Sequence, residues 1–381
     1  MDKKPKILFI LHLPPPVHGA AMVGKWIHDS KLLNDTFDCR YINLTAAANL
    51  SDIGKVGFKK VISFSKMMMR IRRSVKVFQP DLVYVTPNAS GGAFYKDFLV
   101  VNMLKRMGCR VLCHYHNKGV KRRQSYALDD QLYRLFFRNI KVLLIVPQLY
   151  DDMKKYLRIR DTYFCPNGVP ELLVNEEIDA RRNNEVPEVL YLSNLLVSKG
   201  ILDLLDALYL LRGDGYKFHC SVVGAEAAAM DKNRLKEEIE SRHLQDMVEY
   251  AGPKYGEEKD YYLRKADMLA FPSYYPKETF GLVNLEAMEY KLPVISTREG
   301  GIPYVVKDGK TGMICQSRNP IDLAHCLAKL IENPELRIQM GEAGYQYFKS
   351  EFTIDKFIER LINVLNRVLE EMPERKPKKI Y

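Results

Sequence analysis

The chain has 381 residues, of which 47% are hydrophobic and 28% charged, a composition that excludes a disordered chain and a small disulfide module and leaves room for two domains. Its seven cysteines are scattered without a Cys-x-x-Cys pair, which argues against a disulfide framework or a zinc site and favours a reducing cytosol. No segment is apolar over the ~18 residues that a membrane-spanning helix needs.

Charge is divided unevenly along the chain. Residues 1–170 hold 29 Lys or Arg against 12 Asp and no Glu, a net charge of +17, whereas residues 171–381 hold 29 against 35, a net charge of −6. This asymmetry predicts that the first half faces an anionic partner, such as phosphates, nucleic acid or an acidic lipid surface.

Short apolar runs alternate with longer amphipathic stretches throughout the sequence. The runs lie at 6–11, 81–86, 110–115 and 141–146, and again at 188–193, 219–224, 268–273 and 292–297. Such runs are typical of strands buried on both faces of a parallel sheet, which need helical crossovers between them. We therefore expect an α/β fold of two doubly wound Rossmann-like domains, with ligands at the carboxyl ends of the strands.

The stretch 165–187 contains CPNGVP and EVPE and has the composition of a linker. We accordingly expect domains at 1–168 and 169–352. Apolar residues at helical spacing predict a further helix over 353–370, and 371–381 form a basic tail.

The most informative stretch is 266–312. There a strand is followed by a loop with Glu278 and by a helix that holds Glu286. The two carboxylates could each bind hydroxyls of one ligand, although a solvated carboxylate and a helix cap would explain such a pair more often. The free backbone amides at the helix start, which suit an anion, belong to Gly281, Leu282 and Val283.

The two glutamates come with several short motifs in a fixed order. These are Pro272-Ser273, Phe280-Gly281, Glu286-Ala287-Met288, Leu292-Pro293-Val294 and Gly300-Gly301-Ile302-Pro303. The run closely resembles the donor-binding signature of retaining glycosyltransferases with the GT-B fold, family four (group 1 type), and the resemblance continues through 166–169, 191–208 and 222–226. It implies two domains that face each other across a cleft, with the last helix crossing back onto the first domain.

The resemblance also implies roles for residues of the second half. The residue that matches Glu278 contacts donor-sugar hydroxyls near the reacting carbon, and the one that matches Glu286 holds the nucleotide ribose. Lys199 matches the lysine that neutralises the leaving diphosphate, and Asn194 stands where the family usually has Arg, so that position brings no charge. The amides that would hold the sugar hydroxyls and the diphosphate belong to Phe280, Gly281, Leu282 and Val283.

Two positions of the first half match the family less specifically. Gly19 opens a helix after the first strand, where backbone can approach a phosphate or sugar, although a simple turn glycine is equally expected there. His114 and His116 end another strand, and His116 is the better match to the family histidine near the reacting centre. Two histidines without a third ligand cluster do not predict a metal site. Because Asp-x-Asp is absent from the sequence, we expect no metal and no cofactor beyond the nucleotide-sugar substrate.

These matches imply a glycosyltransferase of the hexosyl or N-acetylhexosaminyl type. The donor would bind to 169–352 and the acceptor, a glycan or lipid-linked hydroxyl of cell-surface polysaccharide assembly, to 1–168. The leaving phosphate would accept the proton from the acceptor, so that no strong side-chain base is needed. Two alternatives remain: a nucleotide-sugar epimerase of the same fold, whose acid and base residues are not evident, and a degenerate, non-catalytic partner in a glycan-assembly complex, which Asn194 suggests.

The segment 54–79 holds eight Lys or Arg and no acid, with apolar residues recurring every three or four positions. This pattern predicts a basic amphipathic helix or helix pair, which either lies on an anionic membrane surface or packs its apolar stripe on its own sheet. A second basic cluster, Lys118, Lys121, Arg122 and Arg123, favours the membrane. Because the basic residues lack interleaved aromatics, we expect no nucleic acid partner. The expected location is cytoplasmic, peripheral at the inner membrane face.

Overall fold

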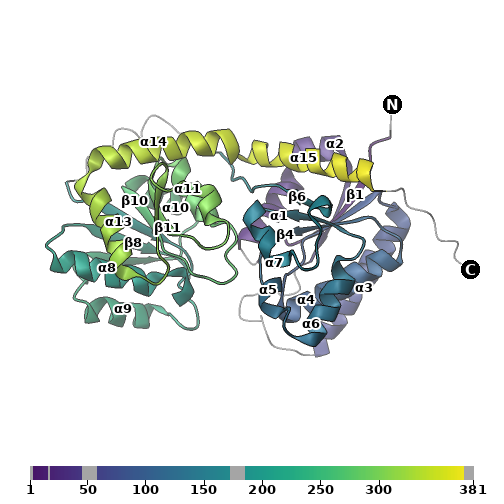
Figure 1. Cartoon of the computed structure of the whole chain (residues 1–381), viewed down its shortest axis with the longest axis horizontal. Coiled ribbons are helices and arrows are strands. Elements are labelled where there is room, and N and C mark those ends of the chain that lie inside the picture. The colour runs from purple at the N-terminus through teal and green to yellow at the C-terminus, as the bar shows by residue number, and fades with distance from the viewer. Residues whose placement is uncertain (1–2, 16–17, 45–57, 172–184, 373–381) are drawn as a thin grey trace, which may run out of the picture. The chain divides into compact units, whose positions relative to one another are not determined.

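The computed structural model describes residues 3–15, 18–44, 58–171 and 185–372. The chain divides into two compact units: unit 1 consists of residues 1–167 together with 354–381, and unit 2 of residues 168–353 (Figure 1). Several features expected from the sequence lie outside the described residues, namely Lys55 of the basic segment, the centre of the linker at 172–184 and the tail from 373 onward.

Unit 1 is built on a six-stranded sheet in which neighbouring strands run parallel, in the order β2-β1-β3-β4-β5-β6. The strands are β1 (Lys6–Leu11), β2 (Asp38–Asn43), β3 (Leu82–Val85), β4 (Val111–Tyr115), β5 (Lys141–Leu144) and β6 (Thr162–Phe164). The four central strands coincide with the four apolar runs of the sequence. The two edge strands were not predicted, because β2 is polar and half exposed and β6 has only three residues.

Helices cover both faces of the unit 1 sheet, as the apolar strands require. They are α1 (Gly19–Asp29), α2 (Lys31–Thr36), α3 (Phe58–Phe78), α4 (Gly91–Arg106), α5 (Val120–Arg123), α6 (Ala127–Phe137), α7 (Tyr150–Met153) and α15 (Ile354–Glu371). The last of these, α15, belongs to unit 1 although it ends the described chain. Its Leu369 carbonyl accepts a hydrogen bond of 3.0 Å from Arg110, and its residues Phe357, Leu361 and Leu365 are buried.

Unit 2 repeats the plan with a second six-stranded parallel sheet, in the order β12-β11-β10-β7-β8-β9. The strands are β7 (Glu188–Leu192), β8 (His219–Val223), β9 (Val248–Gly252), β10 (Met268–Phe271), β11 (Val294–Thr297) and β12 (Gly312–Cys315). The four apolar runs of the second half again form the inner strands. The edge strands β9 and β12 were missed, because each contains glycine and has few fully buried residues.

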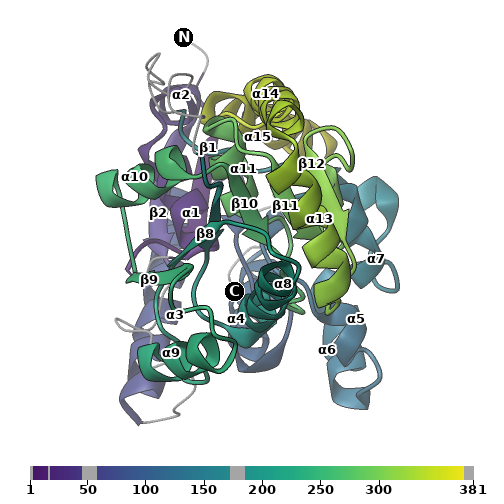
Figure 2. The ribbon, with the colours of Figure 1, turned by 90° about the vertical axis from the view of Figure 1, so that its left-hand side faces the viewer.

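The helices of unit 2 enclose its sheet and complete its core. They are α8 (Ile201–Gly213), α9 (Lys232–Ser241), α10 (Glu257–Lys265), α11 (Leu282–Glu289), α12 (Ile302–Val305), α13 (Pro320–Glu332) and α14 (Pro334–Glu351). Helices α8 and α13 lie side by side (Figure 2), and their leucines share one buried cluster with the side chains of β7, β8 and β10. This packing fixes the loops that follow β7 and β10, where the candidate site lies.

Candidate active site

The candidate site of unit 2 lies where the order of its strands reverses. Strands β7 and β10 are neighbours at the centre of the sheet, with β8 and β9 on one side and β11 and β12 on the other. Lys199 ends a 3-10 turn after β7, and Glu278 lies in the loop after β10. A reversal of this kind is where open parallel sheets bind ligands, since the two loops diverge from adjacent strand ends.

A glycine lets these two loops approach each other closely. Gly200 has a left-handed φ of +85°, and a Cβ at this position would lie 2.2 Å from the carbonyl oxygen of Pro272. Any side chain would therefore push the loop after β7 away from the end of β10. The contact holds Lys199, the residue before this glycine, against the loop that carries Glu278.

Lys199 and Glu278 form a largely buried ion pair. The distance from Nζ of Lys199 to Oε2 of Glu278 is 2.5 Å, and the two side chains are 17% and 9% exposed. The ammonium group also lies 5.1 Å from the ring centre of Phe271 and 5.0 Å from that of Tyr275. Shielding from water makes the attraction stronger than in a surface pair, so the two charges hold each other in a defined place.

The remaining contacts of the Glu278 carboxylate tie it to the start of α11. Its Oε1 accepts hydrogen bonds from the backbone N–H groups of Gly281 at 3.2 Å and Thr279 at 3.3 Å, and its Oε2 accepts one from Ser273 at 3.4 Å. The amide of Gly281, expected to face a ligand, is thus bonded to Glu278. The amides of Leu282 and Val283 donate to no group within the described ranges and are the available donors at this helix end.

Two left-handed glycines shape the beginning of α11. Gly281 has a φ of +69°, and a Cβ there would lie 2.6 Å from Nδ2 of Asn284. Gly300, with a φ of +57°, would carry its Cβ 2.2 Å from the carbonyl oxygen of Glu278. The motifs that contain these glycines therefore serve close packing. Phe280 is buried, with its ring centre 5.9 Å from that of Phe352.

Glu286 lies further along α11 and forms a separate ion pair. Its Oε1 is 3.1 Å from Nζ of Lys259 in α10, and each side chain is about a quarter exposed. Lys259 was not predicted as a site residue, because it lies in an ordinary charged helix 27 positions upstream and only the fold brings it to Glu286. Asn194, at the end of β7, is exposed, and its side chain makes no hydrogen bond to the part of the chain that is described.

Histidines gather at the carboxyl ends of the strands in unit 1. His116 follows β4, with its ring centre 4.0 Å from that of His114, which is hydrogen-bonded to the hydroxyl of Tyr84. His12 follows β1, and its ring centre lies 6.0 Å from that of His18, the N-cap of α1. Gly19 is the exposed first residue of that helix. His12 and His18 were not among the predicted site residues.

These histidines are held in the neutral form. His12 and His116 keep a partly exposed edge, yet burial of the rings lowers the pKa of each to about 3. Burial also lowers the pKa of His18, and it places the pKa of His114 well below its ordinary value. The pKa of His12 is lowered further by the positive charge of Lys96. At neutral pH the group can exchange hydrogen bonds but carries no charge.

The two basic clusters of the first half differ in the structure. Lys121 and Arg123 are paired with Asp151 at 2.5 Å and with Asp129 at 2.6 Å, so their charges are already compensated. In α3 the residues Ile71, Val75 and Phe78 are buried in unit 1, while Ile62, Met69 and Val77 are exposed among the basic side chains. The helix therefore packs one apolar face on its own unit and presents other apolar side chains to solvent.

The described residues contain neither a membrane-spanning helix nor a metal-binding cluster. None of their helices has the length and apolar character needed to cross a membrane. No group of three or more His, Cys, Asp or Glu side chains in this part of the chain could hold a metal ion.

The second unit is similar to a family of known sequences. The model of the family "Glycosyl transferases group 1" matches residues 175–347. D-inositol 3-phosphate glycosyltransferase of Corynebacterium jeikeium (strain K411) is 35% identical over 147 residues, 39% of this chain and 33% of that protein. N-acetyl-alpha-D-glucosaminyl L-malate synthase of Bacillus anthracis is 30% identical over 171 residues, 45% of this chain and 40% of the synthase. The chain thus spans well under half the length of these relatives.

Comparison with solved structures covers both units. Sucrose-phosphate synthase from Thermosynechococcus elongatus has a TM-score of 0.75 at 18% identity, over 97% of this chain and all of that chain. Anabaena Alr3699/HepE in complex with UDP has a TM-score of 0.73 at 16% identity, over 95% of this chain and all of that chain. Both have the GT-B fold, so the predicted fold class of two doubly wound α/β domains is confirmed.

Proposed function

We propose that this chain, which belongs to the glycosyl transferases group 1 family, is a glycosyltransferase. It transfers a hexosyl or N-acetylhexosaminyl group from a nucleotide-diphosphate sugar. The acceptor is a hydroxyl of a glycan or of a lipid-linked molecule. The transfer retains the configuration of the sugar and serves cell-surface polysaccharide assembly. Unit 2 binds the donor and unit 1 the acceptor. Two complexes of Anabaena Alr3699/HepE, with UDP and glucose and with UDP-glucose, are consistent with a nucleotide-sugar donor.

The observation that carries this proposal is the ion pair between Lys199 and Glu278. A cation suited to a leaving diphosphate and a carboxylate suited to sugar hydroxyls lie 2.5 Å apart. A nucleotide-sugar, in which a sugar is directly bonded to a diphosphate, can engage both side chains. The free amides of Leu282 and Val283 add donors with the positive end of the α11 dipole behind them.

Lys199 has a defined role in this scheme. As the bond between sugar and diphosphate breaks, negative charge builds on the leaving oxygen, and a fixed ammonium group stabilises that charge without reorganisation. With Asn194 in place of a second cation, Lys199 and the start of α11 supply the main stabilisation. Glu278 holds the Lys199 ammonium in position before the donor binds.

Glu286 holds the ribose of the donor. Lys259 occupies its Oε1 at 3.1 Å and leaves Oε2 to accept a hydrogen bond from a ribose hydroxyl. The ion pair limits rotation of the carboxylate, so the oxygen that meets the ribose keeps one direction.

The neutral histidines fit a reaction in which the leaving phosphate accepts the proton. A base with the pKa of His116, about 3, would remove a hydroxyl proton poorly at neutral pH, but the neutral ring can orient the acceptor hydroxyl or a sugar hydroxyl. The mechanism needs no metal ion and no cofactor. Gly19, next to His18, leaves room for a phosphate or sugar of the donor at the start of α1.

Attachment to the membrane completes the proposal. The basic side chains of α3 attract an anionic lipid surface, which brings unit 1 to the inner membrane face, where lipid-linked acceptors are extended. The protein therefore works as a peripheral enzyme in the cytoplasm.

Ligand binding and turnover test the proposal. Binding of UDP, GDP, ADP and their sugar conjugates is measured by thermal shift and calorimetry, with and without EDTA. One nucleotide should bind selectively and stabilise the protein. Its affinity should be the same with EDTA and lower in Glu286→Ala. Conversion of the donor sugar without an acceptor would indicate an epimerase instead. Absence of binding across the whole panel would contradict the proposal and favour a non-catalytic partner protein.

A further inference from the structure

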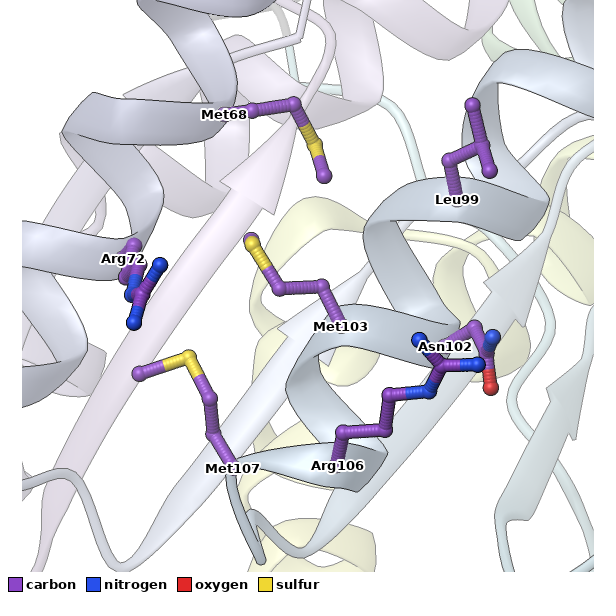
Figure 3. A pocket seen from close by; sticks show the side chains of 7 residues that line it. All are labelled: Met68, Arg72, Leu99, Asn102, Met103, Arg106 and Met107. Atoms are coloured by element: carbon purple, nitrogen blue, oxygen red, sulfur yellow. The ribbon is translucent and has the colours of Figure 1, made fainter.

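A groove of about 450 Å³ opens between α3 and α4 of unit 1 (Figure 3). Methionine side chains from both helices form its centre, with an arginine on either side of them in the view of Figure 3. The residues on which the argument rests are Met68 and Arg72 of α3, Leu99, Met103 and Arg106 of α4, and Met107, which follows α4.

The groove lies where the packing of α3 on unit 1 loosens. Val75 and Phe78 are buried, whereas Met68, two turns before Val75, is only partly covered and faces Met103 and Met107. Methionine is unbranched and polarizable, so a row of three methionines adapts to a flexible apolar ligand better than to a rigid one. The lining of the groove therefore suits a hydrocarbon chain.

The two charged side chains that line the groove, Arg72 and Arg106, are both positive. The exposed cations of α3 and the end of α4 make no ion pair with any described residue, and α3 contains no acidic residue. In this they differ from Lys121 and Arg123 of the same unit, whose charges are compensated by aspartates. These cations are Lys66, Arg70, Arg72, Arg73, Lys76 and, at the end of α4, Arg106.

We propose that the groove binds one acyl chain of an anionic phospholipid, with Arg72 and Arg106 on the headgroup phosphate. Guanidinium groups bind phosphate through paired hydrogen bonds, and each methylene buried in the groove strengthens binding about fourfold. The inference rests on the membrane attachment in the proposed function and deepens it, because it names the lipid class and the face of α3 that receives it. The lipid thereby orients unit 1 on the membrane.

Methionine oxidation distinguishes the groove from the outer face of α3. The full chain is mixed with phosphatidylglycerol vesicles or with phosphatidylcholine vesicles, exposed to dilute hydrogen peroxide and analysed by mass spectrometry. With phosphatidylglycerol in excess, oxidation of Met103 and Met107 should slow about tenfold or more, because only the unbound fraction reacts. Met69, which is 62% exposed on α3, serves as the internal reference, and its rate should fall much less than the rates of Met103 and Met107.

A matched pair of charge variants tests the headgroup contact. Arg72→Glu/Arg106→Glu should weaken binding to phosphatidylglycerol vesicles at least about thirtyfold, since each basic residue near the lipid contributes about fivefold. The control Lys217→Glu/Lys310→Glu makes the same change of charge at exposed lysines of unit 2 and should bind nearly as the unmodified protein does. Equal melting temperatures exclude a folding defect.

Three results would overturn the inference. Protection of Met69 with continued oxidation of Met103 and Met107 would place the lipid on the outer face of α3. Protection of the groove by rising protein concentration without vesicles would assign it to a second copy of the chain. No binding to vesicles would remove both the groove and the membrane attachment, whereas nucleotide binding and sugar transfer, measured separately, would still stand.

Discussion

The carboxyl ends of the two sheets carry different chemistry on the same plan of strands. In unit 2 the loops after β7 and β10 bring together two full charges, Lys199 and Glu278, shielded from solvent. In unit 1 the loops after β1 and β4 carry His12 and His116, which burial keeps neutral. One doubly wound sheet is thus equipped for a ligand with fixed charge, and the other for groups that exchange hydrogen bonds.

The largest effect should come from removing the cation of unit 2. Lys199→Met keeps most of the length of the side chain but removes the charge that, in our proposal, stabilises the leaving diphosphate, so kcat/KM should fall about a hundred- to a thousandfold. Steady-state transfer kinetics measure this loss. The control Lys277→Met removes an exposed lysine next to Glu278 and should keep near-normal activity. A Lys199→Met enzyme that works at nearly full rate would remove this residue from the site.

The stability of the same pair gives a second test. Lys199→Met leaves the Glu278 carboxylate buried without its countercharge, so the free energy of unfolding should fall by up to about 3 kcal/mol. The double variant Lys199→Met/Glu278→Gln removes both charges and should be less destabilised than the single one. Urea unfolding of both variants measures the difference. A double variant that is no more stable than Lys199→Met would mean that the two side chains do not interact.

The neutral histidines of unit 1 predict a dependence of stability on pH. Their pKa values lie below the ordinary value of about 6.5, so the unfolded chain binds more protons than the folded chain between pH 6.5 and 3. The stabilisation is complete above pH 6.5 and is lost as the pH falls, by about 1.4 kcal/mol per pH unit for each histidine. Denaturant unfolding between pH 5 and pH 7.5 measures the slope, and His12→Asn should reduce it by the share of one histidine. An unchanged slope in that variant would show that folding does not lower the pKa of His12.

The smallest effect is expected from replacing Lys259, which pairs with Glu286, the residue proposed to bind the ribose. Lys259→Met frees the Glu286 carboxylate to rotate, so affinity for the nucleotide should fall about fivefold, equivalent to one modest hydrogen bond. Calorimetry with the nucleotide and its 2′- and 3′-deoxy forms measures the effect, and the loss should disappear for the form that lacks the contacted hydroxyl. Lys254→Met, which breaks the neighbouring ion pair with Glu258, is the control. An equal loss for every nucleotide would separate Lys259 from the ribose.

The sequence predicted what depends on local pattern. The eight inner strands are apolar on both faces, and Lys199 and Glu278 lie in short motifs next to two of them. The edge strands β2, β6, β9 and β12 were missed, because an edge strand needs no continuous apolar run. Lys259 and the methionine groove were missed for another reason: each acquires its meaning from a residue far away in the chain, and only folding brings the two together.

The most direct test compares a nucleoside diphosphate with its nucleoside in one calorimetric experiment, on the unmodified protein and on Lys199→Met. The account predicts that the diphosphate binds the unmodified protein more tightly than the nucleoside does, and that Lys199→Met abolishes most of this difference while nucleoside affinity stays the same. A diphosphate that gains nothing over the nucleoside, or that keeps its full advantage in Lys199→Met, would contradict the assignment of this site to a nucleotide-sugar donor.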